Sequence, residues 1–187
     1  MQNSGSNPTI FLAFATADQI WADKMRTLLE KQGLKVLQAA STANADHLER
    51  DANLSLIAKA SVVFVLIGPQ TRASKSVDQQ VEVALVHATS SPPAGLVAVI
   101  LPNHIDFSLP FYDPQNVPLR IHDHVSRESA ILRKFSLDPD VILSWIEEAS
   151  RRRQRFPAPF VSFATQSALA KVQWDASVDQ ASSEMDL

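Results

Sequence analysis

The sequence predicts an α/β protein built on a parallel sheet of about five strands, with helices covering both faces. Short uncharged runs rich in β-branched and aromatic side chains recur along the chain, the clearest from Ser61 to Ile67. Such runs are typical of strands buried on both faces. Stretches with apolar residues at three- and four-residue spacing alternate with these runs and indicate amphipathic helices. Strands that alternate with helices favour a parallel sheet.

Composition limits the kind of protein this is. The 187 residues are 45% hydrophobic and 20% charged, which is typical of one globular domain. A net charge of −3 gives no bulk electrostatic reason to bind nucleic acid. The chain has no Cys and only four Gly, and it contains neither a Walker loop nor a G-x-G-x-x-G motif. We therefore expect no disulfide, no thiolate chemistry and no glycine-rich phosphate cradle.

The chain divides into a polar lead-in at 1–8, a domain at 9–155 and a tail at 156–187. The lead-in lacks the charged region and the apolar region that a signal peptide has. The apolar runs of the whole sequence are too short to span a membrane. We therefore expect a cytoplasmic protein.

The first third of the domain reads as strand, helix and strand. Thr9–Phe14 is the first buried strand, and a helix follows between Asp18 and Gly33. Asp18 is interpreted first as the cap of this helix and second as a residue that orients a ligand. Gly33 lies where the helix ends, and 34–37 is the second strand.

The middle third carries the predicted centre of the sheet. A loop of small residues at 38–45 precedes a helix at 46–59, which opens with a capping-box pattern. The strand at 61–67 ends abruptly at Gly68-Pro69, since Pro donates no ladder hydrogen bond. A polar loop at 70–75 leads to a helix that begins near Ser76 and spans Val77–Ala88. The loop lies at the carboxyl edge of the sheet, where open α/β sheets bind ligands.

The last third continues the alternation. Leu96–Leu101 is the fourth strand, and a proline-containing loop covers 103–118. The segment 117–125, VPLRIHDHV, is predicted to contain a short fifth strand. Asp138-Pro139 begins a helix, because Pro suits the first helical position. Its arginines at 151–155 are interpreted as a solvated helix end. The buried face of this helix is predicted to consist of Ile142, Trp145, Ile146 and Ala149.

The segment 66–85, LIGPQTRASKSVDQQVEVAL, resembles bacterial TIR-like domains (Toll/interleukin-1 receptor fold), where a buried strand leads into the active-site helix. The opening IFLAFATADQIWADKMRTLLEKQGLKV and the later GLVAVILP and VPLRIHDHV are similar to pieces of the same family. The closest resemblance is to the TIR-like proteins of Thoeris-type anti-phage defence. It covers roughly 9–153 and implies a flavodoxin-like three-layer TIR domain.

The resemblance implies NAD+ cleavage between nicotinamide and ribose, with NAD+ as substrate and no cofactor. The family pattern is roughly LIG-x-x-T, a few polar residues and Trp-Val-x-x-Glu-Ile. Ser76 stands at the Trp position and Gln80 at the position of the catalytic Glu. The amide oxygen of Gln80 can still accept from a ribose hydroxyl, but it supplies no negative charge to an oxocarbenium-like transition state. Gln80 is either a natural loss of activity or an engineered Glu-to-Gln change.

The resemblance also places further ligand-binding residues beside Gln80. Glu82 is discounted as a substitute carboxylate. Residues two positions apart on a helix are rotated by about 200°, so Glu82 points nearly opposite Gln80. An Arg in the loop could bind a pyrophosphate bidentately. The ligand-binding candidates are Phe14, Ala15, Thr16, Asp18, Thr71, Arg72, Ser74 and Ser76.

Two other site chemistries are disfavoured. A phospho-receiver domain needs clustered carboxylates at strand ends, and only Asp18 follows the first strand. His104, His122 and His124 could suggest a metal, but His122 and His124 alternate in a predicted strand or turn and are interpreted as solvent-facing. We therefore expect no metal site.

The helix at 77–88 has apolar residues outside its core-facing stripe. At 100° per residue, Val83 and Val86 fall away from the stripe of Val77 and Val81. This predicts a cover, either the tail or, as we favour, a second subunit.

Together these expectations describe an NAD+ nucleosidase or ADP-ribosyl cyclase-type TIR enzyme of bacterial immunity. It would produce an ADP-ribose-type nucleotide signal, possibly cyclic in form, for a partner effector, without contact to nucleic acid or membrane. The alternative is a catalytically silent TIR-like binding or assembly module.

Overall fold

A parallel sheet forms the middle layer of the molecule. Within residues 8–38, 55–86, 94–155 and 172–173, which the computed structural model of the chain describes, the sheet has five strands in the order β2-β1-β3-β4-β6. The strands are β1 (Thr9–Phe14), β2 (Lys35–Gln38), β3 (Val62–Ile67), β4 (Gly95–Ile100) and β6 (Ala130–Lys134). Every residue of β3 and β4 is buried, as their uncharged composition predicts. The predicted α/β fold class is confirmed.

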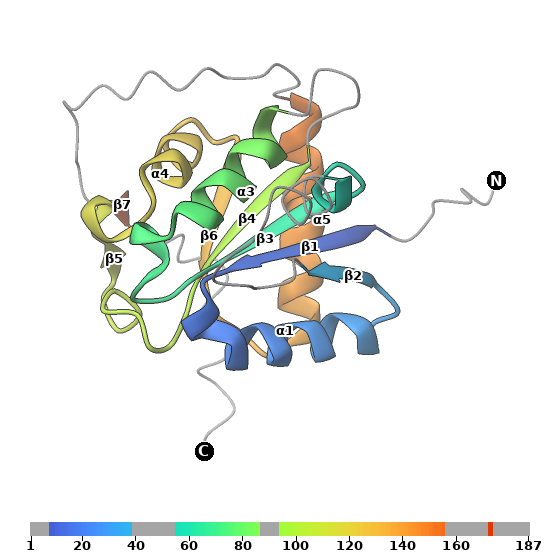
Figure 1. Cartoon of the computed structure of the whole chain (residues 1–187), viewed down its shortest axis with the longest axis horizontal. Helices are drawn as coiled ribbons and strands as arrows, with labels where there is room; N and C mark the ends of the chain where they lie inside the picture. The colour runs from blue at the N-terminus through green and yellow to red at the C-terminus, as the bar shows by residue number, and fades with distance from the viewer. Residues whose placement is uncertain (1–7, 39–54, 87–93, 156–171, 174–187) are drawn as a thin grey trace.

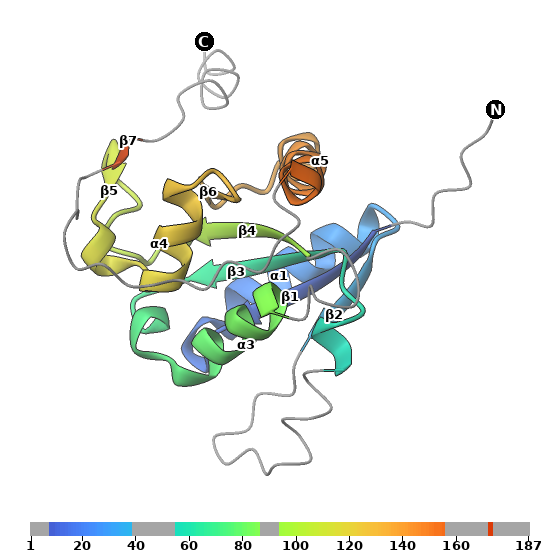
Figure 2. The same cartoon turned by 90° about the horizontal axis from the view of Figure 1, so that it is seen from above.

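Four helices cover the described part of the sheet, two on each face (Figures 1 and 2). They are α1 (Gln19–Lys31), α3 (Lys75–Val86), α4 (Leu119–Ser126) and α5 (Pro139–Arg155). Apolar side chains of α1 and α5 pack on one face, and those of α3 and α4 pack on the other. Residues 55–57 are also helical, whereas most of the helix predicted at 46–59 lies outside the described residues.

Short elements complete the connections. The single turns of 3-10 helix are η1 (Thr16–Asp18), η2 (Thr71–Ala73) and η4 (Pro114–Asn116). Outside the main sheet, β5 (Phe111–Tyr112) pairs antiparallel with β7 (Val172–Gln173) from the C-terminal segment.

Register and glycine positions fix how tightly the layers pack. Phe64 lies in β3 opposite Leu12 of β1 and Val97 of β4, and no part of Phe64 is exposed. A Cβ atom on Gly95 would lie 2.8 Å from backbone atoms of Ala149, so α5 approaches the start of β4 closely only because Gly has no side chain. Gly33, with φ of 75°, ends α1 as predicted.

The prediction of a strand within 117–125 is wrong. This segment contains α4, and the fifth strand of the main sheet is β6, which follows it. Val117, Ile121 and Val125 are spaced by four residues and all pack into one core cluster, which is helical spacing. A nine-residue segment with alternating polar residues fits the period of a strand as well as that of a helix. Its contacts with α3 favour the helix.

The interpretation of His122 and His124 as solvent-facing is also wrong. Both lie on α4 and are buried. His122 Nδ1 lies 3.1 Å from the Tyr112 hydroxyl, and His124 Nδ1 lies 2.8 Å from Ser129 Oγ. Burial lowers the pKa of both imidazoles, and Arg127 adds to the lowering of the pKa of His124.

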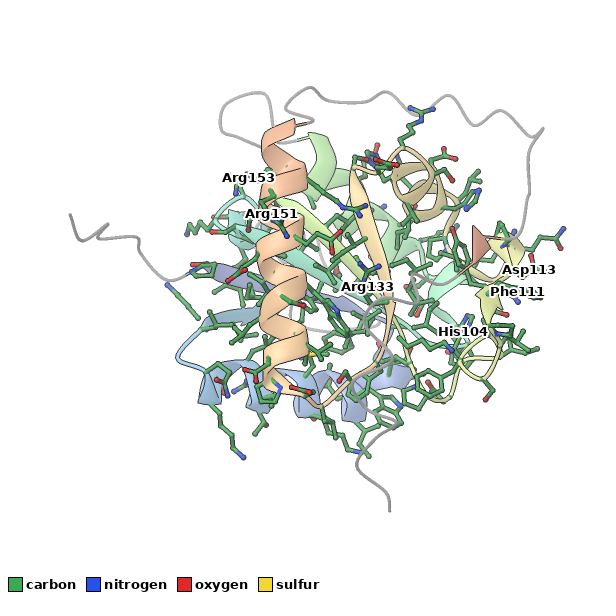
Figure 3. All side chains as sticks on the ribbon, turned by 180° about the vertical axis from the view of Figure 1, so that it is seen from behind. His104, Phe111, Asp113, Arg133, Arg151 and Arg153 are labelled. Carbon is green, nitrogen blue, oxygen red and sulfur yellow. The ribbon has the colours of Figure 1, made fainter. Side chains whose placement is uncertain are left out.

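The interpretation of the arginines at the end of α5 as solvated is wrong for Arg152 and Arg153, whereas Arg151 is exposed. Arg152 donates to the backbone oxygen of Ala130 at 2.8 Å, and Arg153 donates to that of Ser61 at 3.2 Å. Both side chains are half-buried, and burial lowers the pKa of Arg153. Figure 3 shows Arg151 and Arg153 near the end of α5. Arg152 and Arg153 tie the helix to the amino end of the sheet.

The expectation that Val83 faces away from the core is wrong as well. Val83 is half-buried and packs against the core cluster beneath α3. The neighbouring helix α4 contacts α3, and Arg120 of α4 lies 3.3 Å from Asp78 and 3.7 Å from Glu82. The side chain of Val86 lies outside the described residues.

Candidate functional site

The strand order identifies one end of the sheet as the candidate site. The chain runs from β1 outward to β2 and then crosses back to β3, so the connections after β1 and β3 leave in opposite directions. In open α/β sheets, ligands bind beyond the carboxyl ends of the strands at this switch point. The residues that follow β1 and β3 are therefore the first candidates, together with α3, which packs against both strands.

Asp18 is buried where β1 passes into α1. It occupies the N-cap position, but its side chain makes no capping hydrogen bond, so its interpretation as a helix cap is wrong. Instead Oδ1 accepts from Asn103 Nδ2 at 3.1 Å, and Thr71 Oγ1 lies 3.4 Å from Oδ2. The carboxylate joins three connections of the sheet rather than reaching outward from one.

Thr71 and Gly68 are the buried residues at the start of the connection after β3. The Thr71 hydroxyl accepts from the backbone N–H of Gly68 at 2.9 Å and lies 3.2 Å from the carbonyl oxygen of Leu66. Thr71 is 1% exposed. The Thr71 hydroxyl is therefore already hydrogen-bonded within the protein, whereas the resemblance makes it a candidate to bind a ligand.

The start of α3 carries the remaining loop candidates. Ser74 accepts from the backbone N–H of Val77 at 3.3 Å through Oγ, and its carbonyl oxygen accepts from Asp78 N. Ser74 thus begins the helix, which has polar side chains at 74, 75 and 76. Arg72 is exposed on the preceding turn.

Gln80 lies one turn after Ser76 on α3. Its Nε2 donates to Ser76 Oγ at a long 3.4 Å. Its Oε1 is inaccessible to solvent and has no hydrogen-bond partner among the described residues. Buried acceptors are normally paired, so the amide oxygen has unused hydrogen-bonding capacity at the position where the resemblance places a carboxylate.

The candidates after β1 separate into buried and exposed residues. Phe14 and Ala15 are 8% and 7% exposed, and Phe14 belongs to the core beneath α1 and α5. Thr16 begins η1 and is exposed. Of this group, Thr16 has the most surface to offer a ligand.

Asn103 is the member of this region that the sequence prediction missed. It follows β4 and Pro102, so it lies at the same edge as Asp18 and Thr71. A signal was available, because polar residues that directly follow neighbouring parallel strands meet at one edge of the sheet. We refer to Asp18, Gly68, Thr71 and Asn103 as the Asp18 cluster.

A second polar cluster, built around the buried His104 and Asp106, lies in the connection after β4. Asp106 accepts from Asp113 N at 2.9 Å and from Asn116 Nδ2 at 3.0 Å. His104 Nδ1 accepts from Asp106 N at 3.1 Å, and its Nε2 lies 3.2 Å from the carbonyl oxygen of Asn116. We refer to His104, Asp106, Asp113 and Asn116 as the loop cluster; Figure 3 shows His104 and Asp113 close together, well apart from Arg153.

Neither a metal-binding group nor a membrane-spanning helix is found among the described residues. Within them, no three acidic or histidine side chains are grouped so as to hold a metal ion. None of their helices combines the length and apolar character needed to cross a bilayer.

The fold and the site together define an open, flavodoxin-like α/β domain with a candidate ligand site at the switch point of its sheet. The family model described as "TIR domain" matches residues 10–134. The chain belongs to the TIR domain family.

Comparisons with solved structures and with curated proteins give two further results. The chain is similar to the TIR domains in the structure of the activated Roq1 resistosome directly recognizing the pathogen effector XopQ. That match has 13% sequence identity and a TM-score of 0.43, and it covers 79% of this chain and 84% of the other. No curated protein matches the sequence.

Proposed function

We propose that this chain binds NAD+ at the carboxyl ends of β1 and β3 and cleaves its nicotinamide–ribose bond slowly. Membership of the TIR domain family supports the reaction class. The observation that carries the proposal is the amide oxygen of Gln80, which is buried on α3 and unpaired among the described residues. It stands where the family Glu is expected.

The proposed reaction breaks the bond between the nicotinamide nitrogen and the ribose carbon. Nicotinamide leaves with the bonding electrons and becomes neutral, while positive charge develops on the ribose. Water then adds to the ribose carbon and releases a proton, which gives ADP-ribose, or a nucleophile within the nucleotide adds to the same carbon and gives a cyclic product. No cofactor is needed, because NAD+ is the substrate.

Gln80 determines how fast this reaction runs. The residue is half-buried, so once its side chain turns outward its oxygen can accept from a ribose hydroxyl and hold the substrate in place. It cannot offset the charge that develops on the ribose, and loss of one such electrostatic contact costs on the order of a hundredfold or more in rate. A silent binding or assembly module is the alternative that this same observation favours.

The test compares this chain with Gln80→Glu and a matched control, Gln32→Glu. Gln32 is exposed at the end of α1, on the opposite face of the sheet from α3, so the control adds the same charge outside the site. We expect Gln80→Glu to raise NAD+ turnover at least a hundredfold and Gln32→Glu to change it little. Rapid turnover by the unchanged chain would place the carboxylate elsewhere. Failure of both the chain and Gln80→Glu to bind NAD+ would refute the proposal.

The biological setting rests on the resemblance of segment 66–85 to anti-phage TIR-like proteins. On that basis we propose a cytoplasmic role in bacterial immunity, with an ADP-ribose-type nucleotide as signal to a partner effector. Mass spectrometry of nucleotides from cells that express Gln80→Glu tests this directly. A new ADP-ribose isomer or ADP-ribose itself is expected, and unchanged nucleotide pools would contradict it.

Self-association through the helix at 77–88 remains part of the proposal. Because Val83 packs inside, the exposed Gln79 is the better place to test it. Gln79→Arg should lower the solution mass measured by light scattering while the circular dichroism spectrum stays native. A chain that is already monomeric at high concentration would contradict the idea.

A further inference from the structure

The side chain of Asp18 is fully buried at the carboxyl end of β1. It is 0% exposed, and a carboxylate is costly to bury without hydrogen-bond partners. Its place at the amino end of α1 makes a negative charge favourable there. The carboxylate does not cap the helix, so its hydrogen-bonding capacity is directed elsewhere.

The partners of this carboxylate come from two other connections of the sheet. Thr71, which follows β3, is 53 residues away in sequence, and Asn103, which follows β4, is 85 residues away. Since β1, β3 and β4 are neighbours, their connections leave the same edge side by side. Asp18 is thus the common point of three connections that the sequence keeps far apart.

Gly68 shows how closely the connection after β3 lies on this carboxylate. A Cβ atom at Gly68 would lie 2.1 Å from Oδ1 and 2.2 Å from Oδ2 of Asp18. Any other residue at 68 therefore requires the carboxylate or the loop to move. The tight turn after β3 and the buried acid after β1 depend on each other.

A short path leads from this contact to Gln80. Thr71, beside Asp18, begins η2, and η2 leads directly into Ser74. Ser74 accepts from two backbone N–H groups of the first turn of α3, that of Val77 through its side chain and that of Asp78 through its carbonyl oxygen. This chain of contacts connects Asp18 to the start of α3, the helix that carries Gln80.

We propose that Asp18 is a positioning residue of the nucleotide site, holding the connections after β1, β3 and β4 at the spacing that places α3 and Gln80. The inference rests on the proposed function for its kinetic readout. Asp18 itself does not touch the substrate, since its carboxylate is buried and engaged with Asn103 and Thr71.

The conservative variant Asp18→Asn separates positioning from a direct role of the charge. Asn keeps an oxygen to accept from Asn103. Its NH2 group can donate to the Thr71 hydroxyl, which then directs its own proton to the carbonyl oxygen of Leu66, 3.2 Å away. Positioning therefore predicts that Asn restores what Ala loses. A role of the charge predicts that both variants fail alike.

The kinetic experiment uses the Gln80→Glu chain as its background, so that turnover is measurable. Asp18→Ala should lower kcat for NAD+ at least tenfold with a smaller change in KM, and Asp18→Asn should recover most of that loss. Asn103→Ala should lower kcat less, and it should add nothing once Asp18 is Ala. Asp23→Ala is the control, because Asp23 is an exposed acid of the same helix whose side chain accepts from Gln19. Equal losses for Asp18→Ala and Asp18→Asn would overturn the proposal.

The structural experiment needs no NAD+. Gly68→Ala should lower the melting temperature by about 3–10 °C, and by much less in an Asp18→Ala chain, where the new methyl group has room. Amide hydrogen exchange at 68–78 should rise in Asp18→Ala and stay unchanged in Asp23→Ala. An unchanged exchange rate, or an equal cost of Gly68→Ala in both backgrounds, would overturn the proposal whatever NAD+ does. If exchange and coupling behave as expected but Gln80→Glu neither binds nor cleaves NAD+, the proposed function alone fails.

Discussion

The Asp18 cluster and the loop cluster each surround a buried acid, Asp18 or Asp106, that follows a strand of the main sheet, yet they connect different things. The hydrogen bonds of Asp18 join residues 53 and 85 positions apart. Those of the loop cluster join residues 2 to 12 positions apart. The loop cluster therefore makes a single long connection self-supporting, whereas the Asp18 cluster sets the relative placement of three connections. Hydrogen bonds of similar length thus have local consequences in one cluster and site-wide consequences in the other.

The largest expected effect removes the support that both clusters share. Phe64 is wholly buried in the central strand, so Phe64→Ala should lower the free energy of unfolding by roughly 3–5 kcal/mol. Both clusters should then show faster amide exchange. Urea denaturation measures the loss, with Leu137→Ala as the control at a residue that is 57% exposed. An unchanged stability would mean that β3 is not the centre of the sheet.

A smaller effect should follow from breaking the loop cluster alone. Asp106→Ala leaves the N–H of Asp113 and the NH2 of Asn116 without their acceptor, which should cost about 2–3 kcal/mol. Increased exchange should be confined to 102–118. NAD+ turnover in the Gln80→Glu background should stay within about threefold, measured well below the melting temperature. A loss of turnover as large as that of Asp18→Ala would erase the distinction between the clusters.

Alkaline pH should weaken the neighbourhood of the loop cluster through Tyr112. Burial raises the pKa of Tyr112 to about 12, from an ordinary 10.0. The folded chain thus favours the neutral phenol, and its stabilising contribution is complete below pH 10 and lost as pH rises through 12. Tyr112→Phe should remove this pH dependence while costing about 1 kcal/mol near neutrality for the contact with His122.

The chain contains a single Tyr, so phenolate absorbance reports Tyr112 alone. Titration of the folded chain followed by this absorbance gives its pKa directly. A midpoint near 10 would contradict the expected burial. So would parallel pH curves of stability for the wild type and Tyr112→Phe.

Acid pH should give the smallest effect, through His122 and His124 on α4. Burial is the leading cause that lowers both pKa values below 6.5. The unfolded chain therefore takes up protons first, and the stability supplied by the neutral imidazoles is lost as pH falls below about 6.5. The double variant His122→Asn/His124→Asn should have a shallower fall of unfolding free energy between pH 6.5 and 5. An identical slope in wild type and variant would show that neither histidine titrates abnormally.

The layers of this protein follow from local features of the sequence. The runs at 9–14, 61–67 and 96–101 are strands within one residue of the predicted bounds, and the helix at Asp138-Pro139 begins as expected with its predicted face buried. These features are local, because an uncharged β-branched run has few alternatives to a buried strand. The resemblance of 66–85 likewise led to the TIR family, which the match over 10–134 bears out.

Features that depend on distant partners are visible only in the folded chain. Whether 117–125 is strand or helix follows from what it packs against, since so short a segment fits both periods. The burial of His122 and His124, the backbone contacts of Arg152 and Arg153, and the inward side of Val83 arise in the same way. The sequence predicts Asp18 to be a helix cap, because it shows only the residues adjacent to Asp18 along the chain. Its partners, 53 and 85 residues away, meet it only because parallel strands end at one edge of the sheet.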